Sequence, residues 1–583
     1  MDIPAANTAA ARALVAGLAA AGVTDCAISP GSRSTPLTVA FAEQTAVRPW
    51  LHLDERSGAF FALGLARATG RPVALVCTSG TAAANFFPAI VEANLSRIPL
   101  VVLTADRPPA LRDRGAAQTI DQLRLYGTHV RLALDLPLPV GLTGEPSQFR
   151  MHAARAAGMA IGPLPGPVHL NVPFDEPLIA APALHPPGDT RPNPGNTIGL
   201  TASVPGQAEV ALAAERLAGV RRPIVVAGPE TGGLPADDIA FLARRLGAPI
   251  FADGLSGLRT GPHDRALVLD SFDPIVRDPR IAEVRADAIV HFGGPPTSKA
   301  LNGMLAGLRG VPYVLVDRPG GYRDPNLAAD TMLSGEPAAV ARILADMLEW
   351  ESSTDPGWVE GWVASDAMAR EQLRRHVAAF AEPFEGRVFT ELQEMLPAGA
   401  TIVAGNSMPV RDLDSFVVAA EKPLNLVANR GANGIDGVVS SALGAAAARR
   451  GPVVLVIGDI SLFHDMNGLW AAKRHNLDLT VVLVNNNGGG IFNYLPQASH
   501  PTLFEEWFAT PTGLDFAHAA ALYGAKYTVA RDWDAFRAAM ANGLGGGFHM
   551  VELPTDRARN VAMHQQAWKA AADAAFAVEV APA

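Results

Sequence analysis

Cysteine is scarce in this chain. The 583 residues include only two cysteines, Cys26 and Cys77, and each lies in a short apolar run of the kind that forms a buried strand. Small secreted proteins that depend on disulfides carry a far higher density of cysteine. Two thiols in apolar surroundings are typical of a reducing compartment, although the sequence does not exclude a bond between them. We therefore expect a cytoplasmic protein.

The sequence also lacks a long apolar run. No run reaches the roughly 20 residues needed to cross a bilayer. The N-terminus carries Asp2 rather than the basic segment that begins a secretory signal peptide. We expect neither membrane insertion nor a signal peptide.

Charged residues are few, at 18% of the chain, and the acidic ones outnumber the basic ones. The net charge is −10 and the pI is near 5.8, which argues against nucleic-acid binding because that function favours a basic surface. Hydrophobic residues, at 49%, are sufficient for several buried cores. The length predicts more than one domain.

Short apolar segments alternate with alanine-rich segments along the chain, which is typical of parallel α/β layers. We predict three doubly wound α/β domains, at residues 1–185, 208–350 and 380–557, with a linker at 186–207 and a C-terminal helix and tail at 558–583. Four strands are expected in each domain: 25–29, 50–53, 73–78 and 100–104 in the first, 224–227, 250–252, 288–292 and 313–316 in the second, and 401–404, 453–457, 480–484 and 549–553 in the third.

Polar clusters follow these strands in the first and third domains. Ligands of open parallel sheets bind just past the carboxyl ends of the strands. The second domain is plainer, and its loop at 228–233 lacks the spacing of a nucleotide-binding loop. We therefore expect the functional residues in the first and third domains, where the clusters lie at residues 29–34, 54–56, 79–81, 105–107 and 405–407.

Two strands of the third domain end in residues suited to a cation. Asp459 follows strand 453–457, and Asn486 lies 27 residues later, after strand 480–484. Mg²⁺ prefers oxygen ligands in an octahedron. We predict that Asp459, Asn486 and the carbonyl of Gly488 bind Mg²⁺ or Mn²⁺ together with a diphosphate. The alternative is two ordinary turns, since Gly, Asp and Asn favour turns.

This Gly-Asp pair, the gap and the Asn-rich end resemble the diphosphate-anchoring motif of thiamine diphosphate enzymes, although Ile460 replaces the usual third residue, Gly. Such a cofactor also needs a carboxylic acid at N1′ of its aminopyrimidine, and the resemblance assigns that role to Glu55. Glu55 could otherwise be a helix N-terminal charge. Because Glu55 and Asp459 lie on different domains, we expect a homo-oligomer, dimer or tetramer, with sites between subunits.

Four arginines lie on the same strand-end loops. They are Arg33, Arg107, Arg411 and Arg430. A guanidinium group binds a carboxylate through two parallel hydrogen bonds, each charge-assisted bond contributing ~1.5–3 kcal/mol. Any one of them could be a solvated surface charge. Four together indicate substrates with several carboxylates.

The run 28–37 resembles the signature of the 2-succinyl-5-enolpyruvyl-6-hydroxy-3-cyclohexene-1-carboxylate synthases, and so do residues 54–57, 104–109, 429–437 and 485–495. The resemblance covers all three domains, which would be the pyrimidine-binding, central and diphosphate-binding domains. Members commonly lack the third Gly of the motif. The implied reaction belongs to menaquinone biosynthesis: 2-oxoglutarate loses CO₂ and its remaining unit adds 1,4 to isochorismate.

The resemblance also implies the site residues. Ser32, Arg33, Arg107 and Gln118 would face isochorismate, Ser407, Arg411 and Arg430 would hold carboxylates, and Lys299 would reach in from the central domain. The cofactor would contact Glu55, Thr78, Gly80, Asn406, Ser407, Ile435, Gly458, Asp459, Ile460, Ser461, Asn486, Gly488, Gly489, Ile491 and Phe492, with Leu495 in an apolar wall. The chain departs from the family pattern at Ala117 and Ala300.

Two alternatives remain open. Another thiamine diphosphate carboligase, such as an acetohydroxyacid synthase, would act on pyruvate and require a flavin, and the arginines argue against it. A non-catalytic paralogue would not need Glu55, Asp459 and Asn486, all of which are present.

Overall fold

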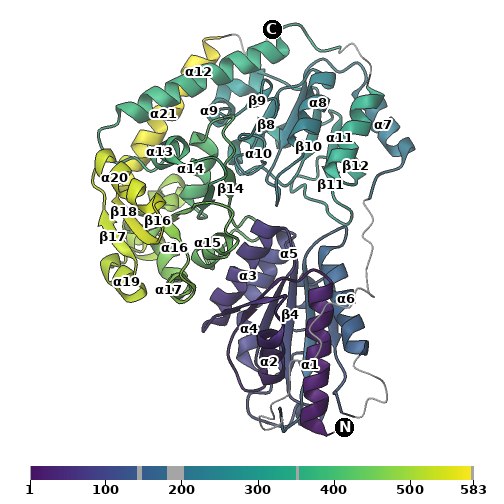
Figure 1. The fold of residues 1–583 in the computed structure, drawn as a ribbon. Coiled ribbons are helices and arrows are strands. Elements are labelled where there is room, and N and C mark those ends of the chain that lie inside the picture. The colour runs from purple at the N-terminus through teal and green to yellow at the C-terminus, as the bar shows by residue number, and fades with distance from the viewer. Residues whose placement is uncertain (1, 141–146, 180–202, 349–352, 579–583) are drawn as a thin grey trace. The chain divides into compact units, whose positions relative to one another are not determined.

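A computed structural model gives the structure of the chain and describes residues 2–140, 147–179, 203–348 and 353–578 (Figure 1). Within these residues the strands form three six-stranded sheets, and every strand pair in them is parallel. The predicted α/β class with three parallel sheets is confirmed. Most of the predicted linker at 186–207 lies outside the described residues, and the predicted domain boundaries remain a prediction.

The chain divides into two compact units. Unit 1 comprises Met1–Thr201, Asn429–Arg449 and His464–Leu477, and unit 2 comprises Ala202–Ala428, Arg450–Phe463 and Asp478–Ala583. The first sheet belongs to unit 1, whereas the second and third sheets both belong to unit 2. We describe each unit by itself.

The sheet of unit 1 has the strand order β2-β1-β3-β4-β6-β5. One core packs α1, α2 and α6 against one face of this sheet, while α3 contacts its central strands elsewhere. The elements are α1 Ile3–Ala20, β1 Asp25–Ile28, α2 Thr35–Glu43, β2 Arg48–Leu51, α3 Glu55–Thr69, β3 Val73–Cys77, α4 Thr81–Asn85, α5 Phe87–Leu95, β4 Leu100–Asp106, β5 Ala133–Asp135, α6 Ser147–Ile161, β6 Pro167–Pro173, α15 Val438–Ala447 and α17 Trp470–His475.

The second sheet has the order β12-β11-β10-β7-β8-β9. Helices α7, α8 and α11 pack on one face through a core of their own. The elements are α7 Gln207–Leu217, β7 Pro223–Ala227, α8 Ala236–Leu246, β8 Ile250–Ala252, β9 Val268–Leu269, α9 Asp273–Arg277, β10 Ala288–Phe292, α10 Lys299–Gly307, β11 Tyr313–Asp317, β12 Thr331–Ser334 and α11 Pro337–Met347.

The third sheet has the order β14-β13-β15-β16-β18-β17, which repeats the order of the first. A continuous core joins it to the second sheet through α12 and α21, which explains why both sheets form one unit. The elements are α12 Trp358–Ala379, α13 Arg387–Met395, β13 Thr401–Ala404, α14 Met408–Phe416, β14 Asn425–Val427, β15 Val453–Gly458, α16 Asp459–His464, β16 Leu479–Asn485, α18 Pro501–Phe504, α19 Phe516–Tyr523, β17 Lys526–Val529, α20 Trp533–Leu544, β18 Phe548–Pro554 and α21 Arg557–Phe576.

The twelve strands expected from the sequence are present, but six further strands were missed. Five of the missed strands, β5, β9, β12, β14 and β17, lie at sheet edges. The sixth, β6, is bounded by Pro167 and Pro173. The strand expected at 50–53 is also wrong in its position, because β2 covers Arg48–Leu51 and Asp54 caps the following helix.

The topology fixes where ligands can bind. In a doubly wound sheet the strand order reverses at a switch point, and the loops there leave room for a ligand. The switch points of the first and third sheets lie between β1 and β3 and between β13 and β15. Most of the polar clusters identified in the sequence lie beside these two points.

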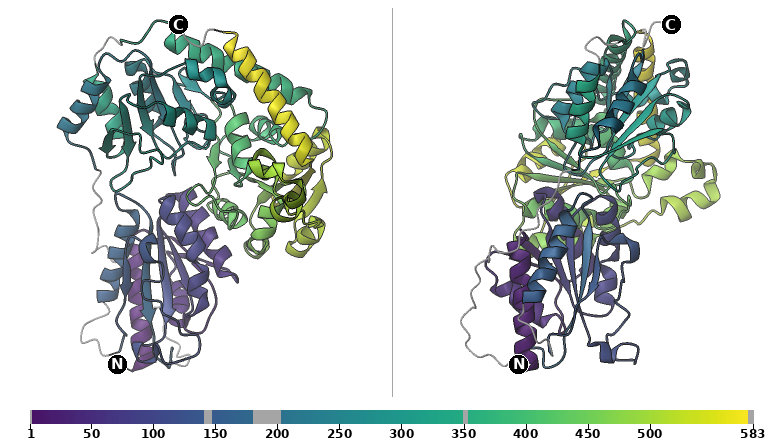
Figure 2. Two further views of the ribbon diagram at one scale, coloured as in Figure 1. Left: turned by 180° about the vertical axis from the view of Figure 1, so that it is seen from behind. Right: turned by 90° about the vertical axis from the view of Figure 1, so that its right-hand side faces the viewer.

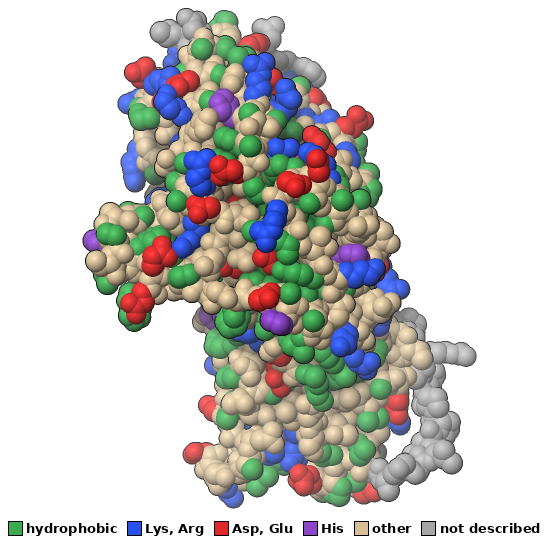
Figure 3. All heavy atoms as spheres, turned by 90° about the vertical axis from the view of Figure 1, so that its left-hand side faces the viewer, with side chains coloured by type: hydrophobic (Ala, Val, Ile, Leu, Met, Phe, Trp, Pro, Cys, Tyr) green, Lys and Arg blue, Asp and Glu red, His purple; other side chains and the backbone are tan. Residues whose placement is uncertain are grey.

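Helix α1 is apolar enough, and at 18 residues long enough, to be a candidate membrane span, but half of its window is buried inside the structure. It packs against α2 and α6 in the core of unit 1. The views in Figure 2 show it alongside the sheet of that unit. On the face shown in Figure 3, basic and acidic side chains are interspersed.

Helices α3 and α15 touch through glycine. A Cβ atom at Gly64 would lie 2.0 Å from the carbonyl oxygen of Ser441, and one at Gly444 would lie 2.1 Å from that of Phe61. A side chain at either position would therefore push the two helix backbones apart. This contact brings α15 into unit 1.

We predict that Gly64→Ala destabilises unit 1 by roughly 1–3 kcal/mol, the usual cost of overpacking. Gly303→Ala is the matched control, because Gly303 also lies within a helix but has open space around its Cβ position. It should be neutral or stabilising, by up to about 1 kcal/mol. Thermal unfolding of both variants measures the difference, and equal midpoints would contradict the close helix contact.

Candidate active site

Thr78 is the centre of the switch point in unit 1. It follows β3, and its Oγ1 accepts a hydrogen bond of 3.2 Å from the backbone N–H of Arg33 in the loop after β1. A Cβ atom at Gly31 would lie 2.3 Å from the Thr78 Cβ, so only glycine allows this approach. Ser32 is exposed beside them. The structure thus brings together the predicted residues Ser32, Arg33 and Thr78.

The loops after β3 and β4 meet at the same edge. The Gly80 N–H donates to Gln122 Oε1 at 2.9 Å. Arg107 donates to the backbone carbonyl of Gln118 at 3.0 Å and to the Ser79 hydroxyl. Gln118 has a φ of 51°, unusual for a residue other than glycine, and an exposed side chain.

The Arg33 side chain is fixed by hydrogen bonds within the protein, which the sequence did not indicate. Its terminal nitrogens donate to the Phe174 carbonyl at 2.9 Å and to Glu176 Oε1 at 2.6 Å. Burial, and then the charge of Arg33, lower the pKa of Arg107. Two guanidinium groups this close favour an anion beside them.

Glu55 is the first residue of α3. The Asp54 side chain caps this helix by accepting the Ser57 N–H at 3.3 Å. The Cys77 thiol has a raised pKa because it is buried and, in addition, because the Glu55 charge is near. Glu55 therefore lies at the carboxyl edge of the sheet, close to the end of β3, as the sequence predicts for a residue of that loop.

A buried carboxylate fixes the loop that carries Arg430. Glu92 is 2% exposed and accepts hydrogen bonds from the N–H groups of Gly431 at 2.9 Å and Ala432 at 2.7 Å. Arg67 faces Glu92 at 3.6 Å and donates to Asn429 Oδ1 at 2.8 Å. Both neighbours of Arg430 in the chain are thus anchored to helices of unit 1. Ile435 is half-buried farther along the same connection.

In unit 2, the loop after β13 is strained. Ser407 has a φ of 71°, in a region that residues other than glycine rarely adopt. Arg411, one turn into α14, donates to the Ser407 carbonyl at 2.5 Å. Asn406 is buried directly before them. The Arg411 side chain therefore bonds back to the backbone of the loop that precedes its own helix.

Two buried side-chain contacts fix α14. Asp412 Oδ1 lies 2.7 Å from His564 Nε2 of α21, and the His564 Nδ1 lies 2.8 Å from the Tyr494 hydroxyl. Asp414 Oδ1 accepts from Arg259 Nη2 at 2.9 Å, with both side chains almost fully buried. Burial raises the pKa of Asp414 to about 7. Helix α14, which carries Arg411, is thus fixed by His564 of α21 and by Arg259 of the segment between β8 and β9.

Asp459 is a buried carboxylate at the third sheet's switch point. It is 2% exposed, and its Oδ2 accepts the Gly488 N–H at 2.8 Å. Burial raises its pKa to about 6, because a charged carboxylate is costly in an apolar environment. A divalent cation would offset that cost.

The three consecutive asparagines have different partners. Asn485 Oδ1 accepts the Asn487 N–H, and Asn487 Oδ1 accepts the Gly513 N–H. The Asn486 Oδ1 is buried and has no hydrogen-bond partner. Since a buried polar atom is normally paired, this oxygen fits a cation ligand. Among the described residues, no cluster of three or more His, Cys, Asp or Glu side chains that could bind a metal occurs.

The glycines at 488–490 have a packing role. A Cβ atom at Gly488 would lie 2.4 Å from the Ala509 carbonyl, and one at Gly489 would lie 2.9 Å from the Phe508 carbonyl. Close packing on residues 505–509 therefore requires glycine here, and the approach of these glycines to phosphates stays a prediction. Phe492 packs on Phe508 with ring centroids 5.9 Å apart.

The predicted site residues form two groups. Unit 1 holds Ser32, Arg33, Glu55, Thr78, Gly80, Arg107, Gln118, Arg430 and Ile435, and unit 2 holds Lys299, Asn406, Ser407, Arg411, Gly458, Asp459, Ile460, Ser461, Asn486, Gly488, Gly489, Ile491, Phe492 and Leu495. Lys299 is exposed at the start of α10, and Ala300 follows it half-buried. Ala117 is exposed next to Gln118.

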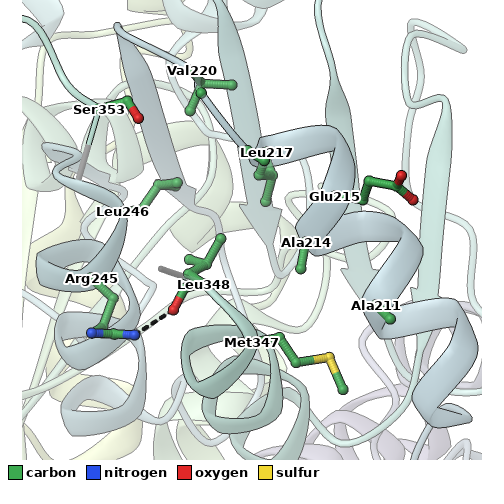
Figure 4. Close-up of a pocket in the computed structure, with 12 residues that line it drawn as sticks. Ala211, Ala214, Glu215, Leu217, Val220, Arg245, Leu246, Met347, Leu348 and Ser353 are labelled. Atoms are coloured by element: carbon green, nitrogen blue, oxygen red, sulfur yellow. Dashed lines mark hydrogen bonds between the residues drawn. The ribbon is translucent and has the colours of Figure 1, made fainter. Parts of the chain in front are cut away.

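A pocket in unit 2 lies apart from these residues in the sequence (Figure 4). It is lined by parts of α7, α8 and α11, including Leu217, Arg245 and Met347. None of the predicted catalytic or cofactor-binding residues lines it.

Sequence reasoning missed the residues behind the site. Gln122, Glu92, Glu385 and His564 contact predicted site residues or their neighbours, but none belongs to a strand-end cluster. Gln122 lies only four positions after the predicted residue Gln118, and this proximity in the sequence could have indicated it.

Comparisons with known proteins define the class first. Residues 8–125 match the family "Thiamine pyrophosphate enzyme, N-terminal TPP binding domain", and residues 413–553 match "Thiamine pyrophosphate enzyme, C-terminal TPP binding domain". An X-ray structure described as a thiamin diphosphate-dependent enzyme from Mycobacterium smegmatis has a TM-score of 0.69 at 21% identity and covers 92% of this chain and 96% of its own. The fold is that of the thiamine diphosphate enzymes.

The family follows from closer relatives. The 2-succinyl-5-enolpyruvyl-6-hydroxy-3-cyclohexene-1-carboxylate synthase of Geobacillus kaustophilus is 49% identical, over 96% of this chain and 96% of the relative. The synthase of Chloroflexus aurantiacus is 45% identical, over 95% of each chain. This chain belongs to the 2-succinyl-5-enolpyruvyl-6-hydroxy-3-cyclohexene-1-carboxylate synthase family, as its sequence motifs predicted.

The anchor of the Arg430 loop gives a testable prediction. Glu92→Leu leaves the buried Arg67 without its anion, which should cost ~3–5 kcal/mol of stability, and should raise the substrate KM by loosening the loop. Glu43→Leu is the control, because its ion pair with Arg12 is about one-third exposed and should contribute at most about 1 kcal/mol. Urea unfolding and steady-state kinetics measure both effects. Equal losses in the two variants would contradict the conclusion that Glu92 anchors the Arg430 loop.

Proposed function

We infer that this chain is a thiamine diphosphate-dependent transferase that forms a C–C bond in menaquinone biosynthesis. It joins the unit left after 2-oxoglutarate loses CO₂ to isochorismate, giving 2-succinyl-5-enolpyruvyl-6-hydroxy-3-cyclohexene-1-carboxylate. Relatives bearing the name of that synthase match nearly the whole chain. The observation in the structure that carries the proposal is the buried, unpaired Asn486 Oδ1 in the segment that follows β16.

The cation and the diphosphate would be held in unit 2. We assign Asp459, Asn486 and the Gly488 carbonyl to Mg²⁺ or Mn²⁺, because the donor set consists of oxygens that suit a hard cation. When bound, thiamine diphosphate supplies a thiazolium carbon that acts as nucleophile and electron sink. Glu55 would hydrogen-bond the aminopyrimidine N1′ and hold a proton there. Thr78, Gly80, Ile435 and Ile491 would line the cofactor.

The arginines account for the substrates. Arg33 lies close enough to Arg107 for its charge to lower the pKa of Arg107, next to the exposed Ser32 and Gln118. This cationic edge suits the carboxylates of isochorismate. Arg411 and Arg430, each on an anchored segment, would bind the carboxylates of 2-oxoglutarate, since a guanidinium held in place loses little entropy on binding.

The structure of the second sheet argues against an acetohydroxyacid synthase. Its switch point lies between β7 and β10. There the Gly294 N–H donates to the Pro229 carbonyl at 2.9 Å, and a Cβ atom at Gly228 would lie 1.7 Å from the Gly294 carbonyl oxygen. Arg323 pairs with Asp317 and Glu230 directly beside these loops. A dinucleotide bound to a doubly wound sheet is expected at such a switch point.

The subunit arrangement and location are part of the proposal. Glu55 belongs to unit 1 and Asp459 to unit 2. We therefore propose a homodimer or homotetramer in which Glu55 of one subunit and Asp459 of another contribute to each site. The two buried free thiols, Cys26 and Cys77, suit the cytoplasm.

The function is tested by incubation of the purified protein with thiamine diphosphate, Mg²⁺, 2-oxoglutarate and isochorismate. We expect CO₂ release and a single adduct identified by mass spectrometry. Pyruvate in place of 2-oxoglutarate should give almost no product, because it lacks the second carboxylate. Turnover of pyruvate that depends on added flavin would support the rival enzyme instead.

Glu55→Gln should lower carboligation by about 10²–10⁴-fold, the range for loss of a general acid–base group. The Asp54 cap and the packing of α3 are unaffected by this change, so circular dichroism and the unfolding midpoint should match the wild type. Retention of full activity would exclude the proposed role of Glu55.

A further inference from the structure

Which atom of Asn486 faces the cation depends on its neighbours. The oxygen and nitrogen of a carboxamide are similar in shape, so hydrogen bonding decides its orientation. Asn486 Nδ2 donates to Glu385 Oε1 at 2.9 Å, and Oδ1 is buried without a partner. Rotation of the amide by half a turn would point N–H groups at the cation, and these cannot coordinate it.

Glu385 is itself fixed. It is 3% exposed, and its Oε1 also accepts the Thr555 hydroxyl at 2.9 Å. Its backbone N–H donates to Asn560 Oδ1 of α21 at 3.3 Å. The preceding residue, Phe384, belongs to the core shared by the second and third sheets. The acceptor for Asn486 thus comes from a rigid part of unit 2.

The opposite side of the amide is closed by the backbone. A Cβ atom at Gly490 would lie 2.7 Å from Asn486 Nδ2, so a side chain there would displace the amide. Glycine at 490 leaves the space that Nδ2 needs to reach Glu385. The fixed carboxylate of Glu385 and the glycine at 490 therefore both favour this orientation of the Asn486 amide.

We propose that Glu385 is the positioning residue of the cation site, whose carboxyl group directs Asn486 Oδ1, rather than Nδ2, toward the metal. This inference rests on the proposed function for the identity of the site, but it concerns a residue outside every sequence motif. Groups that orient metal ligands in this way typically contribute 10–100-fold to metal affinity.

The test measures Mn²⁺ binding by electron paramagnetic resonance, with saturating thiamine diphosphate and no substrate. Glu385→Leu removes the acceptor and should weaken Mn²⁺ binding by about 10–100-fold. Glu385→Gln keeps an oxygen acceptor and should bind Mn²⁺ as the wild type does. Glu382→Leu is the matched control, because Glu382 lies three positions before Glu385 and forms an exposed ion pair with Arg559.

A donor–acceptor exchange tests the same idea if Glu385→Leu does not fold. Asn486→Asp places two carboxylates against each other and should weaken Mn²⁺ binding. Adding Glu385→Gln restores a donor opposite an acceptor, so the double variant should recover affinity. Cation-free unfolding midpoints should stay similar across the variants that fold.

Each outcome has a distinct meaning. If the wild type does not bind Mn²⁺ with the cofactor, the proposed cation site is wrong. If the wild type binds but Glu385→Leu binds equally well, or if the double variant is no better than Asn486→Asp, the role of Glu385 is wrong and the proposed function stands.

Discussion

The hydrogen bond from the Gly488 N–H to the buried Asp459 carboxylate is the contact on which the rest of the site depends. Parallel pairing of β15 with β16 sets Gly458 opposite Val484, so the loops after both strands emerge side by side. The 2.8 Å bond then fixes one loop to the other. Asn486 begins the second of these loops, and its Nδ2 donates to Glu385. The geometry of the proposed cation site is therefore a consequence of strand register.

The predicted site contains groups whose burial or backbone conformation is unfavourable. Burial raises the pKa of Asp459 to about 6, and Asn486 Oδ1 has no partner. Ser407 occupies a backbone region that costs of order 1–3 kcal/mol. Stable proteins tolerate such costs mainly at functional sites, where a ligand offsets them. On α14, by contrast, the buried Asp412 and Asp414 are paired with His564 and Arg259.

The sequence predicted the central strands, which are buried on both faces, and the polar residues that directly follow them. Central strands such as β3 and β16 are continuous apolar runs, and residues of the predicted site directly follow them. Edge strands such as β9 and β17 are short or half-exposed and carry no such signal. Glu92, Glu385 and His564 could not be predicted, because the residues they contact near the predicted site lie 70 to 340 positions away in the chain. Only the tertiary fold brings these residues to the loops they hold.

The most direct test of this account is a crystal structure of the protein grown with thiamine diphosphate and Mn²⁺, using the anomalous signal of the metal. We predict one strong peak per site within coordination distance of an Asp459 carboxylate oxygen, Asn486 Oδ1 and the Gly488 carbonyl, with Asn486 Nδ2 still bonded to Glu385. A metal bound elsewhere, or coordinated without Asn486, would contradict the account.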